Sequence, residues 1–212
     1  MKIVVTRAAD QAGELARRVE DLGHEVEICP LIEIEPIGPA EIDVSGYDWV
    51  VVTSPNGARE LASRMRGRPA RLAAIGRGTA DALRAHGLDP DLIPARSTQE
   101  GLLADLPRPA GRVLFGAAAG ARSLLVEELD ADFAPLYRSN ERRPPEFPDA
   151  DLVLLASPSA ARAYGALGRH APAVSIGPET TRAARSAGIE VVAEAETHDL
   201  DGMVEAVRRA AD

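Results

Sequence analysis

Two short segments of the sequence repeat one arrangement of small and hydroxylated residues. Residues 73–87 and 174–188 each contain an apolar run ending in Ile-Gly, then two variable residues, a threonine, and a helical pattern that closes on glycine. A glycine at a strand end lets the backbone approach a ligand closely. The first N–H groups of the following helix have no partner inside the helix and, with the helix dipole, attract anions. The repeated turns are therefore typical of a site for negatively charged groups.

Two further turns also match each other. Residues 51–61, VVTSPNGAREL, correspond to residues 154–164, LLASPSAARAY, so Ser54 and Ser157 each stand before a proline that begins a helix. Proline is tolerated in a first helical turn, and serine commonly caps one. The duplicated turns thus have two interpretations. They form corners around a ligand with several negative groups, or they are structural corners that a gene duplication copied.

Other common catalytic patterns are missing. Residues 76–81, GRGTAD, begin like the dinucleotide fingerprint G-x-G-x-x-G, but Asp81 replaces the third glycine, and the phosphate-binding G-x-x-x-x-G-K-[ST] does not occur. The serine-hydrolase pattern G-x-S-x-G is also absent. The four histidines are scattered and the single cysteine, Cys29, lies in an apolar run. We therefore expect neither a metal site nor a nucleophilic cysteine.

Tyr137 is a further candidate for chemistry. It ends the run FAPLY, residues 133–137, where a charged, proline-rich segment begins. A tyrosine at such a junction can donate a proton or a hydrogen bond, or it can pack at a seam between domains. Both interpretations remain open on position alone.

The rest of the sequence supplies the elements that must position these residues. Apolar, β-branched runs alternate with amphipathic helical patterns, which predicts parallel sheets covered by helices on both faces. Proline-rich connectors interrupt this rhythm at residues 30–43 and 138–149. The predicted strands are residues 2–6, 25–29, 48–54, 72–76, 91–94, 111–116, 133–137, 151–157, 173–177 and 189–195. The predicted helices are residues 10–22, 55–65, 77–87, 99–106, 121–129, 158–167, 178–188 and 200–210.

Composition limits the classes of function. The 212 residues suffice for one large domain or two small ones, and the net charge of −9 argues against a nucleic-acid partner. No apolar stretch approaches the ~20 residues of a membrane span, and the N-terminus lacks the pattern of a signal peptide. We expect a cytoplasmic protein without nucleic-acid or membrane partners.

Seven segments follow one another in a fixed order over nearly the whole chain. They are VTR at 5–7, DWVVVTSPNGA at 48–58, AIGRGTADALRAHG at 74–87, STQEGLL at 97–103, LYRS at 136–139, ASPSAARAY at 156–164 and SIGPETTRAARSAGIEVVAEA at 175–195. Each segment is degenerate by itself, but in their order and spacing they resemble the uroporphyrinogen-III synthase family. The segment ELDADF, residues 128–133, lacks the glycine that the family usually has between helix and strand.

The resemblance implies an α/β fold of two flavodoxin-like, parallel-sheet domains that are internally duplicated and joined by a two-stranded linker. Domain 1 would be discontinuous, formed by residues 1–34 and 142–212, and domain 2 would comprise residues 38–138. The chain would leave domain 1 through the first proline-rich connector and return through the second.

The resemblance also implies an activity. Enzymes of this family, which are carbon–oxygen lyases of the hydro-lyase type, cyclise hydroxymethylbilane, a linear tetrapyrrole with eight carboxylates, to uroporphyrinogen III and invert the last pyrrole ring. They need no cofactor or metal. We expect a monomer of haem and porphyrin biosynthesis with transient contact to the upstream deaminase. The alternative is a non-catalytic, two-lobed sensor module that binds tetrapyrroles.

Matching residues to the family motifs assigns the site. Tyr137 is the candidate catalytic proton donor. The substrate-binding candidates, expected to line a cleft between the domains, are Arg7, Ser54, Asn56, Gly76, Thr79, Arg122, Ser157, Ser159, Gly177 and Thr180.

Overall fold

The structure, a computed structural model, describes residues 1–169 and 171–211. It contains two compact units: unit 1 comprises Met1–Ile34 and Ser139–Asp212, and unit 2 comprises Glu35–Arg138. The sequence predicted that domain 1 resumes at residue 142 and that domain 2 begins at residue 38. In the structure these boundaries lie at Ser139 and Glu35.

Two strands run from one unit into the other: β3, Ile32–Pro36, and β9, Asp132–Glu141. They are neighbours in one sheet. The Ile37 N–H donates to the Leu136 carbonyl, and the Arg142 N–H donates to the Leu31 carbonyl, so the two strands run antiparallel. These strands are the two-stranded linker.

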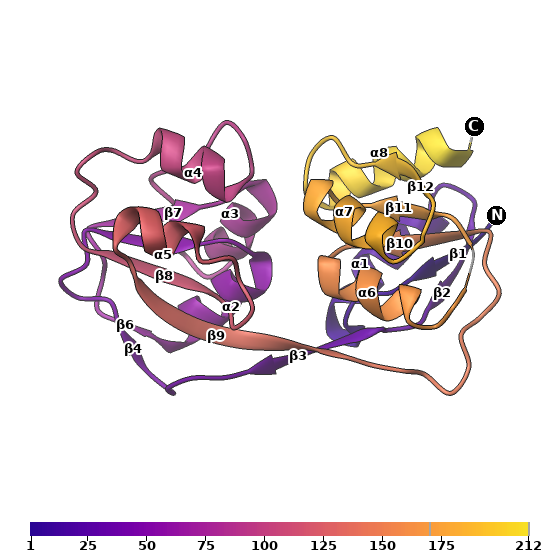
Figure 1. The fold of residues 1–212 in the computed structure, drawn as a ribbon, viewed down its shortest axis with the longest axis horizontal. Coiled ribbons are helices and arrows are strands. Elements are labelled where there is room, and N and C mark those ends of the chain that lie inside the picture. Colours follow the sequence, from indigo (N-terminus) through magenta and orange to yellow (C-terminus); the bar gives the residue numbers. More distant parts are fainter. Residues whose placement is uncertain (170, 212) are drawn as a thin grey trace. The chain divides into compact units, whose positions relative to one another are not determined.

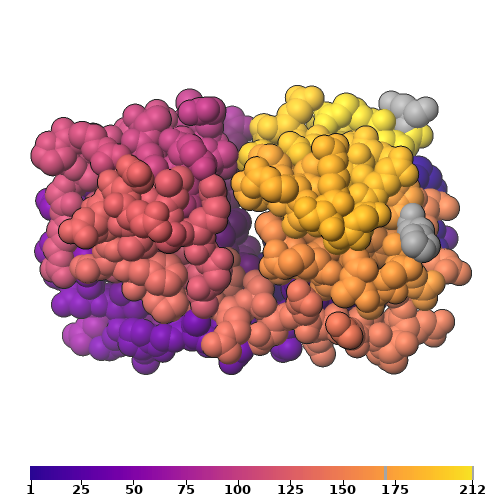
Figure 2. All heavy atoms as spheres, viewed as in Figure 1, coloured from indigo at the N-terminus to yellow at the C-terminus, as the bar shows by residue number. Residues whose placement is uncertain are grey.

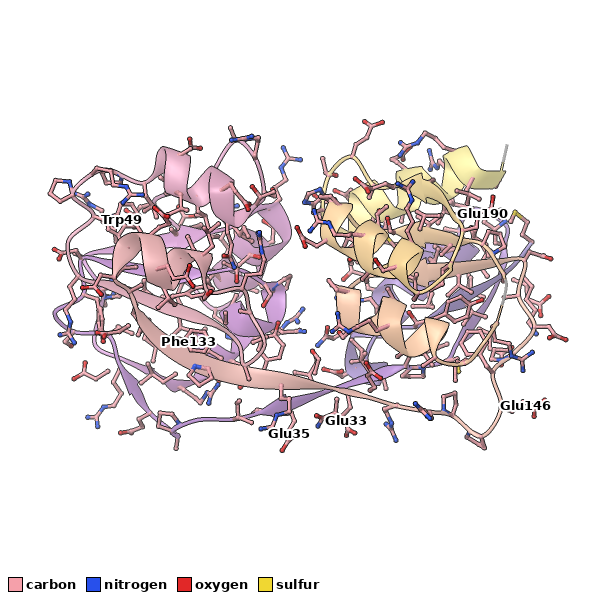
Figure 3. All side chains as sticks on the ribbon, viewed as in Figure 1. Glu33, Glu35, Trp49, Phe133, Glu146 and Glu190 are labelled. Atoms are coloured by element: carbon pink, nitrogen blue, oxygen red, sulfur yellow. The ribbon has the colours of Figure 1, made fainter. Side chains whose placement is uncertain are left out.

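Side chains alternate along β3 as its pleat requires. Ile32 packs with Ala8 and Ala160 in unit 1, and Ile34 contacts the same cluster. Glu33 and Glu35 project from the other side of the strand (Figure 3) and are exposed.

Unit 1 is a five-stranded parallel sheet with helices on both faces (Figure 1). Its strand order is β12-β11-β10-β1-β2, the order of flavodoxin-like sheets. The strands are β1 (Lys2–Val5), β2 (Glu25–Ile28), β10 (Leu152–Leu155), β11 (Ala173–Ser175) and β12 (Val191–Glu194). The helices are α1 (Ala9–Glu20), α6 (Pro158–Gly165), α7 (Pro178–Ser186) and α8 (Leu200–Ala211).

The core of unit 1 has two layers because successive strand residues point to opposite faces. Ile3 and Val5 pack with Leu15 of α1 and Met203 of α8. Val4 lies in the opposite layer, which includes Tyr164 of α6 and Ala184 of α7. The atoms of α6, α7 and α8, orange to yellow, cover most of unit 1 in the view of Figure 2.

Unit 2 has a five-stranded sheet in the order β3-β9-β8-β5-β7. An isolated parallel bridge between Ala73 and Leu92 extends the β7 edge. The remaining strands of this sheet are β5 (Trp49–Val52), β7 (Arg71–Ala74) and β8 (Val113–Ala118). The helices are α2 (Pro55–Arg64), α3 (Arg77–Arg84), α4 (Gln99–Asp105) and α5 (Leu124–Leu129). A small sheet pairs β4 (Ile42–Asp43) with β6 (Met65–Arg66).

The two sheets have the same spatial order of matching strands. β11-β10-β1-β2 of unit 1 corresponds to β7-β5-β8-β9 of unit 2, and Leu92 stands where unit 1 has β12. In the chain the order differs, because unit 1 begins with the strand that matches β8. The arrangement is consistent with an internal duplication.

Several predicted elements differ from those observed. The strand expected at 133–137 extends over Asp132–Glu141, the helix expected at 77–87 ends at Arg84, and the connector expected at 30–43 contains β3 and β4. The strand expected at 91–94 is reduced to the Leu92 bridge. The helix expected at 55–65 ends one residue earlier because Met65 is extended and pairs with Ile42. The helix expected at 121–129 begins only at Leu124.

Asp130 takes the place of the glycine that the family usually has between α5 and β9. It adopts a left-handed conformation with φ 48°, and it ends α5. Aspartate tolerates this region better than most residues with a side chain, so the tight helix-to-strand turn is kept.

Candidate functional site

The sequence-predicted residues of unit 2 follow the carboxyl ends of its parallel strands. Ser54 follows β5, Gly76 follows β7 and Arg122 follows β8, while Tyr137 lies in β9. These strands are neighbours. The carboxyl edge of a parallel sheet is where open α/β folds bind ligands, so the topology brings these residues to one edge.

Ser54 and Tyr137 are in direct contact. The Ser54 Oγ lies 2.9 Å from the Tyr137 Oη. Ser54 is also the N-cap of α2, and its Oγ accepts a hydrogen bond from the Gly57 N–H at 3.0 Å. The tyrosine is only 7% exposed. Its hydroxyl is therefore held at the start of a helix.

Burial favours the protonated form of Tyr137. Burial raises the pKa of the phenol above its usual value near 10, and the hydrogen bond with Ser54 lowers the pKa and offsets part of that rise. The hydroxyl consequently keeps its proton throughout the neutral range. It can act as a proton donor to a leaving group.

The Ile-Gly turn of unit 2 is closely packed. A Cβ atom on Gly76 would lie 2.6 Å from the Ser97 Oγ, so only glycine lets Ser97 lie this close to the start of α3. Thr79, in the first turn of α3, is 3% exposed, and its side chain packs into the unit.

Unit 1 repeats this geometry with different side chains. A Cβ atom on Gly177 would lie 3.0 Å from the His198 Nε2, so His198 takes the place that Ser97 has in unit 2. Thr180, which matches Thr79, is 2% exposed. Sequence reasoning missed Ser97 and His198 as members of these turns. Aligning 96–102 with 197–203 through their shared glycine would have found the pair.

The Ser-Pro turn of unit 1 caps its helix as that of unit 2 does. Ser157 Oγ accepts from the Ala160 N–H at 3.1 Å, and it lies 3.0 Å from the Ser159 Oγ. Arg7 follows β1, the strand next to β10, and donates to the Gln11 Oε1 at 3.4 Å.

The two kinds of turn differ in how they begin their helices. Ser54 and Ser157 accept hydrogen bonds from their own helices, whereas Gly76 and Gly177 provide no side-chain cap. The first N–H groups of α3 and α7 therefore receive no hydrogen bond from a capping side chain. Asn56, in the first turn of α2, accepts a hydrogen bond from Arg59 at 3.1 Å.

Arg122 forms an ion pair within unit 2. Its guanidinium donates to both carboxylate oxygens of Glu100, at 2.7 and 3.2 Å. This pairing is the largest cause of the low pKa of Glu100, which falls from 4.5 to about 2. The guanidinium that was predicted to bind substrate therefore has a carboxylate partner already.

Glu100→Gln should lower the melting temperature only where Glu100 is ionised. The folded pKa lies below the unfolded one, so the ion pair stabilises fully above about pH 4.5 and is lost as the pH falls toward 2. Because both side chains are about half exposed, we expect about 0.2–1 kcal/mol. Thermal melts of both proteins between pH 2 and 7 measure this. A difference in melting temperature that stays constant with pH would contradict it.

Gln99 was not predicted as a site residue, although it lies beside Arg122. Its side chain donates to the Arg122 carbonyl at 3.4 Å, and its buried Oε1 has no partner among the described residues. Cys29 is buried, and burial raises the pKa of its thiol, which disfavours the reactive thiolate.

Within residues 1–169 and 171–211, no group of three or more His, Cys, Asp or Glu side chains is placed to hold a metal ion. The same residues include no helix that is both long and apolar enough to cross a membrane.

The fold and these turns define a class of protein: two α/β units with flavodoxin-like sheets, whose strands are parallel except for β3, and with turns that open helices at the strand ends. The family model described as uroporphyrinogen-III synthase HemD matches residues 13–205. The chain belongs to the uroporphyrinogen-III synthase family, which confirms the resemblance seen in the sequence.

Individual relatives agree with this assignment. The chain is 30% identical over 151 residues to a putative uroporphyrinogen-III synthase of Methanocaldococcus jannaschii, covering 66% of this chain and 63% of that protein. It is 29% identical over 174 residues to the uroporphyrinogen-III synthase of Synechococcus elongatus, covering 72% and 65%. The matches thus span somewhat less than two thirds of these curated relatives.

Solved structures share the fold. The uroporphyrinogen-III synthetase of Helicobacter pylori has a TM-score of 0.65 at 19% identity, covering 100% of this chain and 99% of that one. A mutant uroporphyrinogen III synthase of Thermus thermophilus has a TM-score of 0.60 at 18% identity, with coverages of 100% and 98%.

Proposed function

We propose that the chain is a uroporphyrinogen-III synthase that converts hydroxymethylbilane into uroporphyrinogen III and water. The observation that carries this proposal is the buried Tyr137, whose hydroxyl lies 2.9 Å from Ser54 at the carboxyl edge of the unit 2 sheet. Membership of the family supplies the substrate class.

In the proposed reaction Tyr137 acts as a general acid. As the carbon–oxygen bond of the terminal hydroxymethyl group breaks, the phenol transfers its proton to the departing oxygen, which leaves as water. The resulting azafulvene keeps its N–H proton and is therefore a cation, and it is attacked by the substituted carbon of the last pyrrole ring. The spiro intermediate then fragments and recloses with that ring inverted. The proton lost at ring closure returns to the tyrosinate, so the reaction is that of a hydro-lyase.

Binding must favour attack at the hindered carbon, because free substrate closes without inversion. Holding one conformation of the chain supplies this selectivity. We propose that the Ile-Gly turns at Gly76 and Gly177 receive substrate carboxylates through their backbone N–H groups, together with Arg7. The net charge of −9 opposes a polyanion at long range, but salt screens this beyond about 8 Å.

The remaining candidates have smaller proposed roles. Asn56 and Ser159 lie in first helical turns and contribute backbone N–H groups. Thr79 and Thr180 are buried and support the Ile-Gly turns by packing inside their units. Arg122 would exchange Glu100 for a substrate carboxylate. We further propose that the protein acts in the cytoplasm as a monomer, needs no cofactor and receives substrate from the upstream deaminase.

Genetic complementation tests this function. A bacterium that lacks its own synthase and depends on supplied haem should grow without haem when it expresses this chain. A binding module without activity would not restore growth. If the cells contain folded protein at normal levels and still do not grow without haem, the proposal is contradicted.

A further inference from the structure

Helix α2 contacts the strand that carries Tyr137 at both of its ends. At the start of the helix, Ser54 Oγ lies 2.9 Å from the Tyr137 Oη. At its end, Arg64 Nη2 donates to the Leu136 carbonyl at 2.6 Å. Leu136 directly precedes Tyr137, so a single helix restrains both the backbone and the hydroxyl of this tyrosine.

Arg64 holds the backbone firmly because most of its donors are used. Its Nη1 donates to the Ile37 carbonyl at 2.6 Å, and its Nη2 forms an ion pair with Glu60 at 3.2 Å. The side chain is only 12% exposed, so water screens these contacts little. With Leu136 fixed in this way, the remaining freedom near the reacting atom is the orientation of the phenol and its hydrogen.

Either hydroxyl of the Ser54–Tyr137 pair can be the donor, so the direction of this hydrogen bond sets where the phenol proton points. The Gly57 N–H already donates to the Ser54 Oγ. When Ser54 donates its own hydrogen to Tyr137 Oη, the phenol keeps its proton free for another acceptor. The chain from Gly57 through Ser54 to Tyr137 also starts at a helix N-terminus, where positive potential stabilises charge that develops on the phenol oxygen.

Comparison with the Ser157 turn of unit 1 distinguishes the contact of Ser54 with Tyr137 from helix capping alone. Ser157 has the same backbone conformation as Ser54 and caps α6 in the same way. Its hydroxyl, however, contacts Ser159, and among the described residues it forms no hydrogen bond with a tyrosine. The Ser54 cap in unit 2 therefore has a partner, Tyr137, that capping does not need.

We propose that Ser54 is a positioning residue that donates a hydrogen bond to Tyr137 and aims the phenol proton at the substrate. This rests on the general-acid role proposed for Tyr137. It differs from the direct substrate contact that the sequence predicts for Ser54.

Kinetics of matched cap variants test the proposal. Ser54→Ala removes the cap and the Tyr137 contact, whereas Thr98→Ala removes the cap of α4, which accepts from the Gly101 N–H at 3.0 Å, and a side-chain hydrogen bond with Glu100, but no contact with Tyr137. Both variants should melt at lower temperature. Only Ser54→Ala should lower kcat, by about tenfold, with KM unchanged, because general acid catalysis depends on alignment. Ser54→Thr keeps the hydroxyl and should restore kcat.

Fluorine NMR gives a readout that does not depend on activity. The chain has three tyrosines, so 3-fluorotyrosine labelling gives a simple spectrum in which Tyr137→Phe assigns the Tyr137 resonance. Ser54→Ala should shift this resonance, and Thr98→Ala should leave it in place. In a Tyr137→Phe background, Ser54→Ala should cause no further loss of kcat.

The outcomes separate the two proposals. An unmoved Tyr137 resonance in Ser54→Ala, or losses of kcat that multiply in the double variant, would overturn the role of Ser54 while the synthase remains active. A wild-type protein that forms no inverted product would instead refute the proposed function. In that case a shifted resonance would support only the contact, and its catalytic purpose would be overturned with the function.

Discussion

Tyr137→Phe should lower kcat about a hundredfold and leave KM within a factor of two. A positioned general acid typically contributes about 10²–10⁴ in rate. The change removes only the hydroxyl, so the ring still fills its place at 7% exposure and the fold should be kept. Substrate released unreacted then closes spontaneously, so the fraction of uninverted product should rise as kcat falls.

Tyr47→Phe is the matched control for this variant. It removes a hydroxyl from the same unit, one that contacts Asp132 at 2.8 Å, at the opposite end of the sheet from the strand ends considered above. We expect kcat within twofold of wild type. Steady-state kinetics with separation of the product isomers measures both variants. A Tyr137→Phe protein that keeps more than a third of wild-type kcat would remove the tyrosine from the mechanism.

Gly101→Ala should cost about 2–3 kcal/mol of unfolding free energy, the largest effect on stability that we expect from a single added methyl group. A Cβ atom on Gly101 would overlap with the Arg96 carbonyl oxygen, and backbone atoms cannot turn away as a side chain can. Gly202 has the same relation to the Thr197 carbonyl in unit 1. Gly202→Ala should therefore cost a similar amount.

Gly13→Ala provides the control for these glycine variants. Gly13 lies exposed within α1, and no atom lies within 4 Å of its added Cβ. Alanine should stabilise this helix by about 0.5–1 kcal/mol. Urea unfolding followed by circular dichroism measures all three variants. A Gly101→Ala loss below about 0.5 kcal/mol would show that the segment near Arg96 shifts at little cost.

The alternation of elements and their carboxyl-edge turns could be predicted because each depends on local sequence. Buried strands such as Trp49–Val52 read as continuous apolar runs, and Pro55 and Pro158 mark helix starts. The ends of the helices and strands were harder to predict from the sequence. Met65 leaves its helix because it pairs with Ile42, a contact between distant segments that the helical pattern does not reveal.

The candidate site was predictable as a set of residues and not as a set of contacts. Ser54 and Tyr137 are separated by 83 positions. The strand order β9-β8-β5 brings them together, with Tyr137 of β9 paired to Ala118 at the end of β8. The Glu100 partner of Arg122 was equally hidden, because acidic residues are common on helix surfaces. Ser97 and His198 could have been found from the repeat itself, since each matches the other through the glycines that follow them.

Product analysis with the purified chain tests the central claim most directly. Freshly made hydroxymethylbilane is mixed with excess protein for a single turnover, and the oxidised uroporphyrins are separated into type I and type III isomers. The account predicts predominantly type III, formed faster than the substrate closes by itself. Only type I isomer, at the rate of the protein-free blank, would contradict it.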